Sequence, residues 1–140
     1  MLYCKRKNST NWQFPQGGID KNEDIFDAAL RELYEEVGIE ENKVKLIKES
    51  DNWYKYDLPK KYKRNSFLWE SFKGQKQKWF LFKLIEETKI DLNNENNPEF
   101  DEFSWVDYWR PLDEIVDFKR EIYEKVLTEL EPAYKSEFSK

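Results

Sequence analysis

Three glutamates at short helical spacing are the residues of this sequence best suited to chemistry. Glu32, Glu35 and Glu36 stand at i, i+3 and i+4, and a helix places such residues within roughly 100° of arc. Each pair of like charges at this spacing is unfavourable by about 0.2–0.5 kcal/mol. Arg31 can reach Glu35, but one arginine does not balance three carboxylates. Hard divalent cations such as Mg²⁺ or Mn²⁺ prefer carboxylate oxygens. The pattern therefore predicts a metal site, and the alternative is a solvated acidic helix face.

The segment that carries these glutamates has the features of an amphipathic helix with defined ends. Asp20-x-x-Glu23 predicts the start, as a capping box in which aspartate replaces serine or threonine. Gly38 predicts the end. One apolar stripe at helical spacing is formed by Phe26, Ala29, Leu30, Leu33 and Val37.

The fixed residues from Gly17 to Ile39 resemble the complete Nudix box, with every defining position filled. These positions are Gly17, Glu23, Arg31-Glu32, Glu35-Glu36 and Gly38. The resemblance implies a metal-dependent hydrolase of nucleoside diphosphates linked to another group. It also implies that Gly17 and the three glutamates belong to the metal site, with Glu35 as the general base.

Further phrases narrow the resemblance to the bacterial RNA pyrophosphohydrolases, from about Leu2 to about Leu130. They are Trp12–Gly18, Tyr56-x-Leu58-Pro59, Gly74–Phe80, Pro98–Asp101, Trp105-Val106-x-Tyr108-Trp109 and Phe118-Lys119-Arg120-x-x-Tyr123. This likeness implies removal of pyrophosphate or phosphate from the 5′-triphosphate end of RNA. The product, a 5′-monophosphate RNA, favours decay. The alternative is a dinucleoside polyphosphate hydrolase, which shares the metal helix.

The likeness also assigns residues outside the helix. Glu99 would join the metal site from a separate loop, where an isolated exposed glutamate is otherwise ordinary. Arg6 and Phe118 would sandwich a base near the RNA 5′ end, with Lys119 beside them. By its apolar character alone, Phe118 would be a core residue.

Two lysines and a glutamine complete the candidate substrate contacts. Lys76 and Lys78 share one face at strand period, where they could meet polyphosphate or the RNA backbone. The alternative is a solvated strand edge protected by lysine. Gln16 precedes the metal loop and either touches phosphate or braces the turn.

Composition restricts the remaining possibilities. The chain has 140 residues and a formal net charge of −5, which favours one domain and argues against a broad grip on nucleic acid; DNA is not expected as a partner. The absence of histidine excludes His-ligated zinc and Ser-His-Asp chemistry. The single cysteine, Cys4, fits a reducing cytoplasm. No apolar run indicates a membrane span.

The expected fold is α/β (α+β): a Nudix-like α/β/α sandwich around a mixed sheet. The single domain covers residues 1–140, with 130–140 as a flexible tail. The family has a further strand before the segment that matches Tyr3–Arg6, so we expect this fold to lack the first strand; a truncated, inactive fragment is the alternative. Expected strands cover 2–5, 44–50, 53–58, 79–85 and 103–106, and the helices after the metal helix cover 111–116 and 119–130. The 53–58 strand is expected beside the 44–50 strand.

Overall fold

The computed structural model describes all residues except 16–21, 56–75, 95–97, 116 and 139–140. The chain begins with strands β1 (Leu2–Arg6) and β2 (Trp12–Gln13) and helix α1 (Ile25–Val37). A 3₁₀ turn, η1 (Glu41–Lys43), then precedes strands β3 (Val44–Glu49), β4 (Tyr54–Lys55), β5 (Lys76–Gln77) and β6 (Phe80–Leu84). Strand β7 (Phe100–Trp105) and helices α4 (Arg110–Glu114) and α5 (Asp117–Phe138) complete it.

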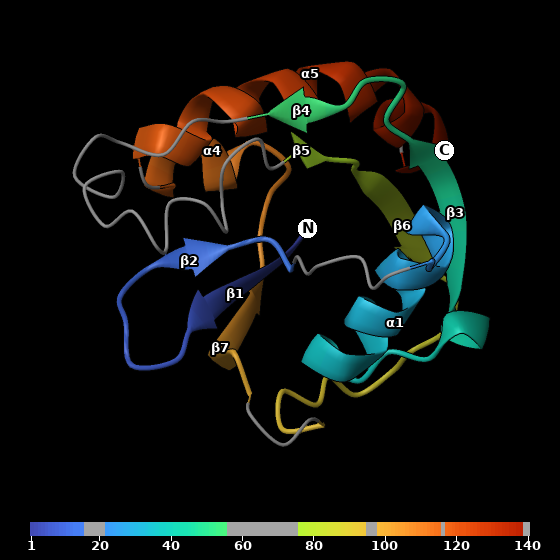
Figure 1. Cartoon of the computed structure of the whole chain (residues 1–140), viewed down its shortest axis with the longest axis vertical. Helices are drawn as coiled ribbons and strands as arrows, with labels where there is room; N and C mark the ends of the chain where they lie inside the picture. The colour runs from blue at the N-terminus through green and yellow to red at the C-terminus, as the bar shows by residue number, and fades with distance from the viewer. Residues whose placement is uncertain (16–21, 56–75, 95–97, 116, 139–140) are drawn as a thin grey trace.

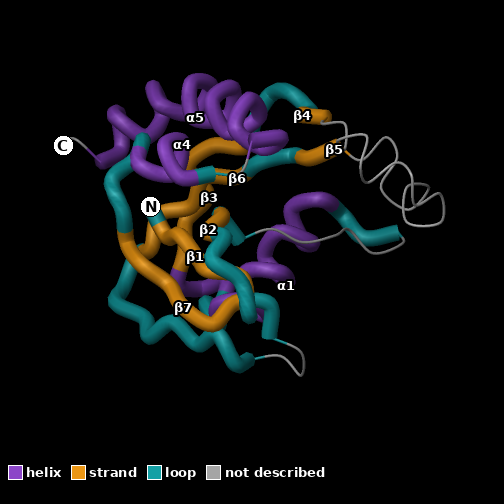
Figure 2. The backbone as a smooth tube through the Cα atoms, turned by 90° about the vertical axis from the view of Figure 1, so that its left-hand side faces the viewer, coloured by secondary structure: helices purple, strands orange, loops and turns teal. Residues whose placement is uncertain are grey.

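The strands lie between two helical layers. Figure 1 shows α5 crossing one end of the molecule above the strands, and Figure 2 shows α4 and α5 on one side of the strands with α1 on the other. The sheets have the orders β2-β1-β7, β3-β6 and β4-β5, and each pair in the described part of the chain is antiparallel. This arrangement confirms the α+β architecture expected from the sequence.

Strand β1 joins the two halves of the core because successive side chains of a strand point to opposite faces. Tyr3 packs with Phe14 and Tyr123, on the side of α5. Cys4 packs with Val37 and Phe100, on the side of α1. One strand therefore fixes α1 on one face and α5 on the other.

The end of α1 follows the sequence prediction, whereas its start does not. Gly38 ends the helix in the left-handed conformation at φ 73°, and its N–H donates to Tyr34 O. The N-cap is Asp24, whose carboxylate accepts from the N–H groups of Phe26 and Asp27. The expected capping box at Asp20 and Glu23 is wrong, because Asp24 caps the helix and both Glu23 oxygens bind an arginine, described below.

Strand pairing corrects a second expectation. The segment from Trp53 was expected beside the 44–50 strand, but β4 pairs with β5, and β3 pairs with β6. Its remainder, residues 56–58, lies outside the described residues. The apolar strand β6 supplies Leu81 to a buried cluster with α5, so burial decides which strand occupies the position beside β3.

Helix α5 is longer than expected. The segment from 130, expected as a tail, is helical as far as Phe138. Tyr134 packs against Tyr108 with ring centroids 4.4 Å apart, and Phe138 stacks on Tyr134 at 4.8 Å. These aromatic contacts continue the buried stripe of Ile122, Val126 and Leu130. Within the described residues, no helix has the length and apolar character needed to cross a membrane.

Candidate active site

Arg31 gathers three carboxylates on one side of α1. Its Nε and Nη2 donate to the two oxygens of Glu23 at 2.8 and 2.9 Å. Its Nη1 lies 2.8 Å from a Glu32 oxygen and 3.1 Å from a Glu35 oxygen. The planar guanidinium suits this fork of contacts. The sequence indicated only the contact with Glu35, since Glu32 and Glu23 are not at the ordinary i, i+4 spacing from Arg31.

Glu36 lies in a different environment from its neighbour in the sequence. The residue is 2% exposed, and neither of its carboxylate oxygens has a hydrogen-bond partner among the described residues. Val37 next to it packs against Cys4 of β1. By contrast, the Glu35 side chain is 39% exposed. The three glutamates of the predicted cluster therefore occupy distinct environments.

The electrostatics of Glu36 follow from this burial. Burial is the largest cause that raises its pKa to about 10, and the negative charges of Glu99 and Glu32 add to it. Ionised carboxylates cannot donate to one another; a proton on Glu36 would be shared with the oxygens of Glu99 and Glu32. A smaller rise in the pKa of Glu32 has the same leading cause, although Arg31 opposes it.

The residues present fit a divalent cation, although its ligand shell is not preformed. In the described ranges, no three acidic side chains converge in the geometry of a metal site. Arg31 holds Glu32 and Glu35, and like charges do not converge unaided. The buried oxygens of Glu36, close enough to Glu32 and Glu99 for their charges to raise its pKa, are the donors that Mg²⁺ or Mn²⁺ prefers.

Glu99 is brought to α1 by strand pairing. The Glu99 carbonyl accepts from the Lys7 N–H at 2.8 Å. Lys7 directly follows β1, and Glu99 directly precedes β7, which pairs with β1. The structure thus brings Glu99, Glu32 and Glu36, three of the metal residues expected from the sequence, close enough for their charges to interact.

Arg6 and Lys119 are close enough to interact, from opposite ends of the sequence. The Lys119 ammonium donates to Gln13 Oε1 at 3.0 Å. Burial first, and then the positive charge of Arg6, lower the pKa of Lys119. Gln13 itself is buried and was not among the sequence predictions, because its contact spans 106 residues. The structure therefore brings two of the predicted substrate contacts, Arg6 and Lys119, close enough for their charges to interact.

The other predicted site residues divide into two groups. The Lys78 ammonium lies 3.7 Å from the Glu49 carboxylate and donates to the Asp51 carbonyl at 3.3 Å. These contacts are with the end of β3 and the segment after it, and not with the glutamates of α1. Four residues or side chains lie outside the described part: Gly17, Gln16 and the side chains of Lys76 and Phe118.

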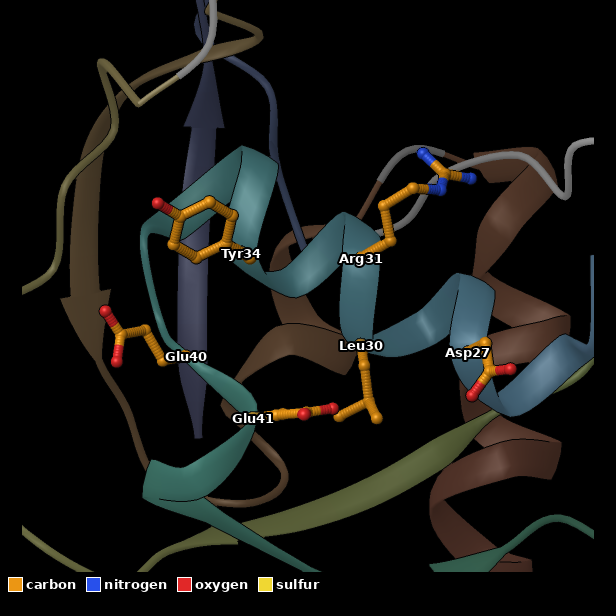
Figure 3. A pocket seen from close by; sticks show the side chains of 6 residues that line it. All are labelled: Asp27, Leu30, Arg31, Tyr34, Glu40 and Glu41. Carbon is orange, nitrogen blue, oxygen red and sulfur yellow. The ribbon is translucent and has the colours of Figure 1, made fainter.

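A cavity of about 530 Å³ lies beside α1. Figure 3 shows the Leu30 and Glu41 side chains pointing toward one another, while the Arg31 side chain extends away from Glu40 and Glu41. The described lining consists of Asp27, Leu30, Arg31, Tyr34, Glu40 and Glu41. Of the site described above only Arg31 reaches it, so the cavity is separate from the buried Glu36.

The chain is similar to known proteins over most of its length. A family model described as NUDIX domain matches residues 1–126. An RNA pyrophosphohydrolase of Haemophilus ducreyi is 45% identical over 92% of this chain. Those of Aliivibrio fischeri and Francisella tularensis subsp. mediasiatica are 44% and 47% identical over 92% and 91% of it. The chain spans 66%, 76% and 82% of the length of these three relatives, respectively, and 63% of one from Actinobacillus pleuropneumoniae.

Two solved structures share the fold. A C. elegans Ap4A hydrolase in a binary complex aligns with a TM-score of 0.63 over 94% of this chain and 86% of that one, at 18% identity. An E. coli dihydroneopterin triphosphate pyrophosphohydrolase aligns with the same TM-score over 91% and 84%, at 21% identity. At such identities the likeness establishes the fold alone.

Proposed function

The chain belongs to the NUDIX domain family, and on this premise we propose that it hydrolyses the 5′-triphosphate end of RNA with the aid of Mg²⁺ or Mn²⁺. The reaction would release pyrophosphate or phosphate and leave a 5′-monophosphate. Relatives named RNA pyrophosphohydrolase, at 44–47% identity over more than nine tenths of the chain, support this substrate class.

The buried Glu36 carboxylate is the observation that carries the metal dependence. A carboxylate with two unpartnered, buried oxygens is costly in a folded protein unless a cation or a proton compensates it. Glu32 and Glu99 bring further negative charge to the same place. A divalent cation bound there would neutralise phosphate charge and make a nearby water more acidic.

Within this proposal, Glu35 accepts the proton of the attacking water. It is the most solvent-accessible of the three helix glutamates, and its contact with Arg31 Nη1 at 3.1 Å fixes the direction of its carboxylate. Arg31 also anchors Glu23 and Glu32, and so keeps the base and one ligand in a constant relation. Gln16 and Gly17 precede α1 in the sequence. Gly17 is proposed to contact the metal, and Gln16 is proposed to contact phosphate.

The RNA beyond the phosphates is proposed to meet Arg6, Phe118 and Lys119. The proximity of Arg6 and Lys119 supports this part of the proposal, since two neighbouring cations favour an anionic backbone. The hydrogen bond from Lys119 to Gln13 would hold the ammonium in place.

The test compares a short 5′-triphosphorylated RNA with diadenosine tetraphosphate, each with Mg²⁺ and with excess chelator. The proposal expects metal-dependent release of pyrophosphate or phosphate from the RNA, at a rate well above that on the dinucleotide. A preference for the dinucleotide would replace the proposed substrate with a dinucleoside polyphosphate.

The matched variants are Glu35→Gln and Glu41→Gln, and each removes one negative charge. Glu35 lies in the proposed site, and Glu41 of η1 lies outside it. The first should lower turnover by at least a hundredfold, the usual scale for losing a general base, and leave RNA binding nearly unchanged. Glu41→Gln should retain turnover. Full turnover by Glu35→Gln would remove its assignment as the base.

A further inference from the structure

A second cavity lies between α5 and the segment that leads into β4. Its volume is about 410 Å³, within the range of small-molecule sites. The described lining consists of Asn52, Trp53, Tyr54, Ile122 and Lys125. None of these residues belongs to the carboxylate cluster of α1, and none was singled out as a substrate contact in the sequence.

The wall of this cavity is held by Glu129 of α5. Its carboxylate accepts from the Asp51 N–H at 2.7 Å, from Asn52 Nδ2 at 3.1 Å and from the Tyr54 hydroxyl. Tyr54 is itself buried against Ile122. The Glu129 carboxylate therefore binds residues on both sides of Trp53 in the sequence. These hydrogen bonds fix the segment that carries Trp53.

The described lining of the cavity presents an exposed aromatic ring and an exposed cation. Trp53 is 41% exposed, and the Lys78 ammonium lies 5.4 Å from the centroid of its ring. The Lys125 side chain is 60% exposed and is paired with Glu121 at 3.0 Å. An exposed i, i+4 ion pair is worth only about 0.3–0.5 kcal/mol, so a phosphate can compete for Lys125.

The cavity continues the proposed RNA path along α5. Lys119, Ile122 and Lys125 are spaced at i, i+3 and i+6, so each is a surface neighbour of the next. The six helical steps from Lys119 to Lys125 cover about 9 Å of helix axis. A strand that passes Lys119 therefore reaches the cavity within a short length of chain.

We propose that this cavity binds a nucleotide of the RNA downstream of its 5′ end, with the base stacked on Trp53 and a phosphate at Lys125. The base stacks on the exposed part of the indole. Stacking on an aromatic ring accepts any base, and a nearby cation binds the phosphate backbone. The inference rests on the proposed function for the identity of the ligand as RNA.

Two substitutions with matched controls test the inference on the full 140-residue chain. Trp53→Ala is compared with Trp105→Ala, since Trp105 of β7 is also an exposed tryptophan, at 55%. Lys125→Ala is compared with Lys135→Ala, since Lys135 also lies on α5, exposed and paired with the glutamate four residues before it. Thermal melts establish that each variant is folded.

The substrates are a 5′-triphosphorylated dinucleotide and a 5′-triphosphorylated octanucleotide. Trp53→Ala should raise KM for the octanucleotide about tenfold, equivalent to about 1.4 kcal/mol and within the range for one stacked base, with kcat and the dinucleotide KM unchanged. Lys125→Ala should lower the slope of log Kd against log salt by about 0.7. Trp53→Phe should restore most of the octanucleotide KM, and both controls should match the unaltered protein.

Equal effects of Trp53→Ala on both lengths, or no effect on either, would overturn the inference. Binding of a 5′-monophosphorylated octanucleotide, followed by fluorescence anisotropy, separates this result from a failure of the proposed function. A protein without turnover on either RNA that still loses about tenfold in affinity with Trp53→Ala would refute the function and keep the site. An unchanged anisotropy curve would refute the site, whatever the turnover.

Discussion

Replacing Glu36 with glutamine is expected to stabilise the metal-free protein near neutral pH and to remove its response to divalent metal. Glu36 is 2% exposed, and neither carboxylate oxygen has a partner in the described part of the chain. Glutamine has nearly the same shape and no charge, and its amide can donate to Glu32 or Glu99. The fold is kept while the electrostatic cost of the site is removed.

The magnitude follows from the pKa of Glu36, which burial, followed by Glu99 and Glu32, raises from 4.5 to about 10. A raised carboxyl pKa lowers stability as the pH rises from 4.5 towards 10, because the unfolded chain releases a proton that the folded chain retains. Each pH unit in this window costs about 1.4 kcal/mol. The cost at pH 7 is therefore about 3 kcal/mol, and it requires only that the folded pKa exceed 7. For a chain of this length it corresponds to roughly 10 °C in Tm.

Thermal melts in chelator between pH 4.5 and pH 8 measure this difference. Glu36→Gln should match the unaltered protein near pH 4.5 and exceed it increasingly as the pH rises. Mg²⁺ at about a hundred times its Kd should then stabilise the unaltered protein by about 2.7 kcal/mol and leave Glu36→Gln unchanged. Glu41→Gln, at an exposed position of η1, should follow the unaltered protein throughout. A difference that does not vary with pH, or a variant less stable at pH 7, would refute the assignment of Glu36 as a buried, uncompensated carboxyl.

Three further outcomes follow from the structure. Gly38→Ala should lower the free energy of unfolding, measured by urea denaturation, by about 2–4 kcal/mol. The reason is that φ is +73° and an added Cβ would lie 2.7 Å from Asp91 Cβ. A decrease below about 1 kcal/mol would contradict this strain. Cys4 is fully buried, and burial is the first cause that raises its pKa to about 12, so a thiol reagent should label it only at the rate of unfolding; rapid labelling of the native protein would contradict its burial. Burial alone would raise the pKa of Glu129, but hydrogen bonds led by that of Tyr54 hold it below its usual value, so Glu129 stabilises the fold above its unfolded pKa and loses this effect as the pH falls. Glu129→Gln should therefore melt below the unaltered protein at pH 7 and converge with it in acid, and a constant gap would count against the contact.

Features set by local period were predictable from the sequence. The spacing of Glu32, Glu35 and Glu36 placed them on one helix, and Gly38 marked its end, since both depend only on residues within one turn or two. The stripe of Ile122, Val126 and Leu130 likewise identified the buried side of α5. The helix continued to Phe138 because Tyr134 found an aromatic partner in Tyr108, a contact that helical period does not encode.

The same limit explains the strands. Residues 44–49 and 80–84 are recognisable as strands by their composition, but their pairing with each other is set by burial against α5. The pairing of β4 with β5 brings Tyr54 beside Gln77, and these residues are too far apart in the sequence for a local pattern to predict the contact.

Within the candidate site, the sequence by itself determined which acidic residues are available, and the tertiary structure decided the environment of each. Glu35 and Glu36 are adjacent and chemically identical, yet packing of Val37 against Cys4 buries one, and Arg31 holds the other near solvent. Strand pairing of β7 with β1 brings Glu99 to the cluster. A pKa depends on the charges and solvent that surround a group in space, so only the folded chain distinguishes the buried carboxylate of Glu36 from the exposed one of Glu35.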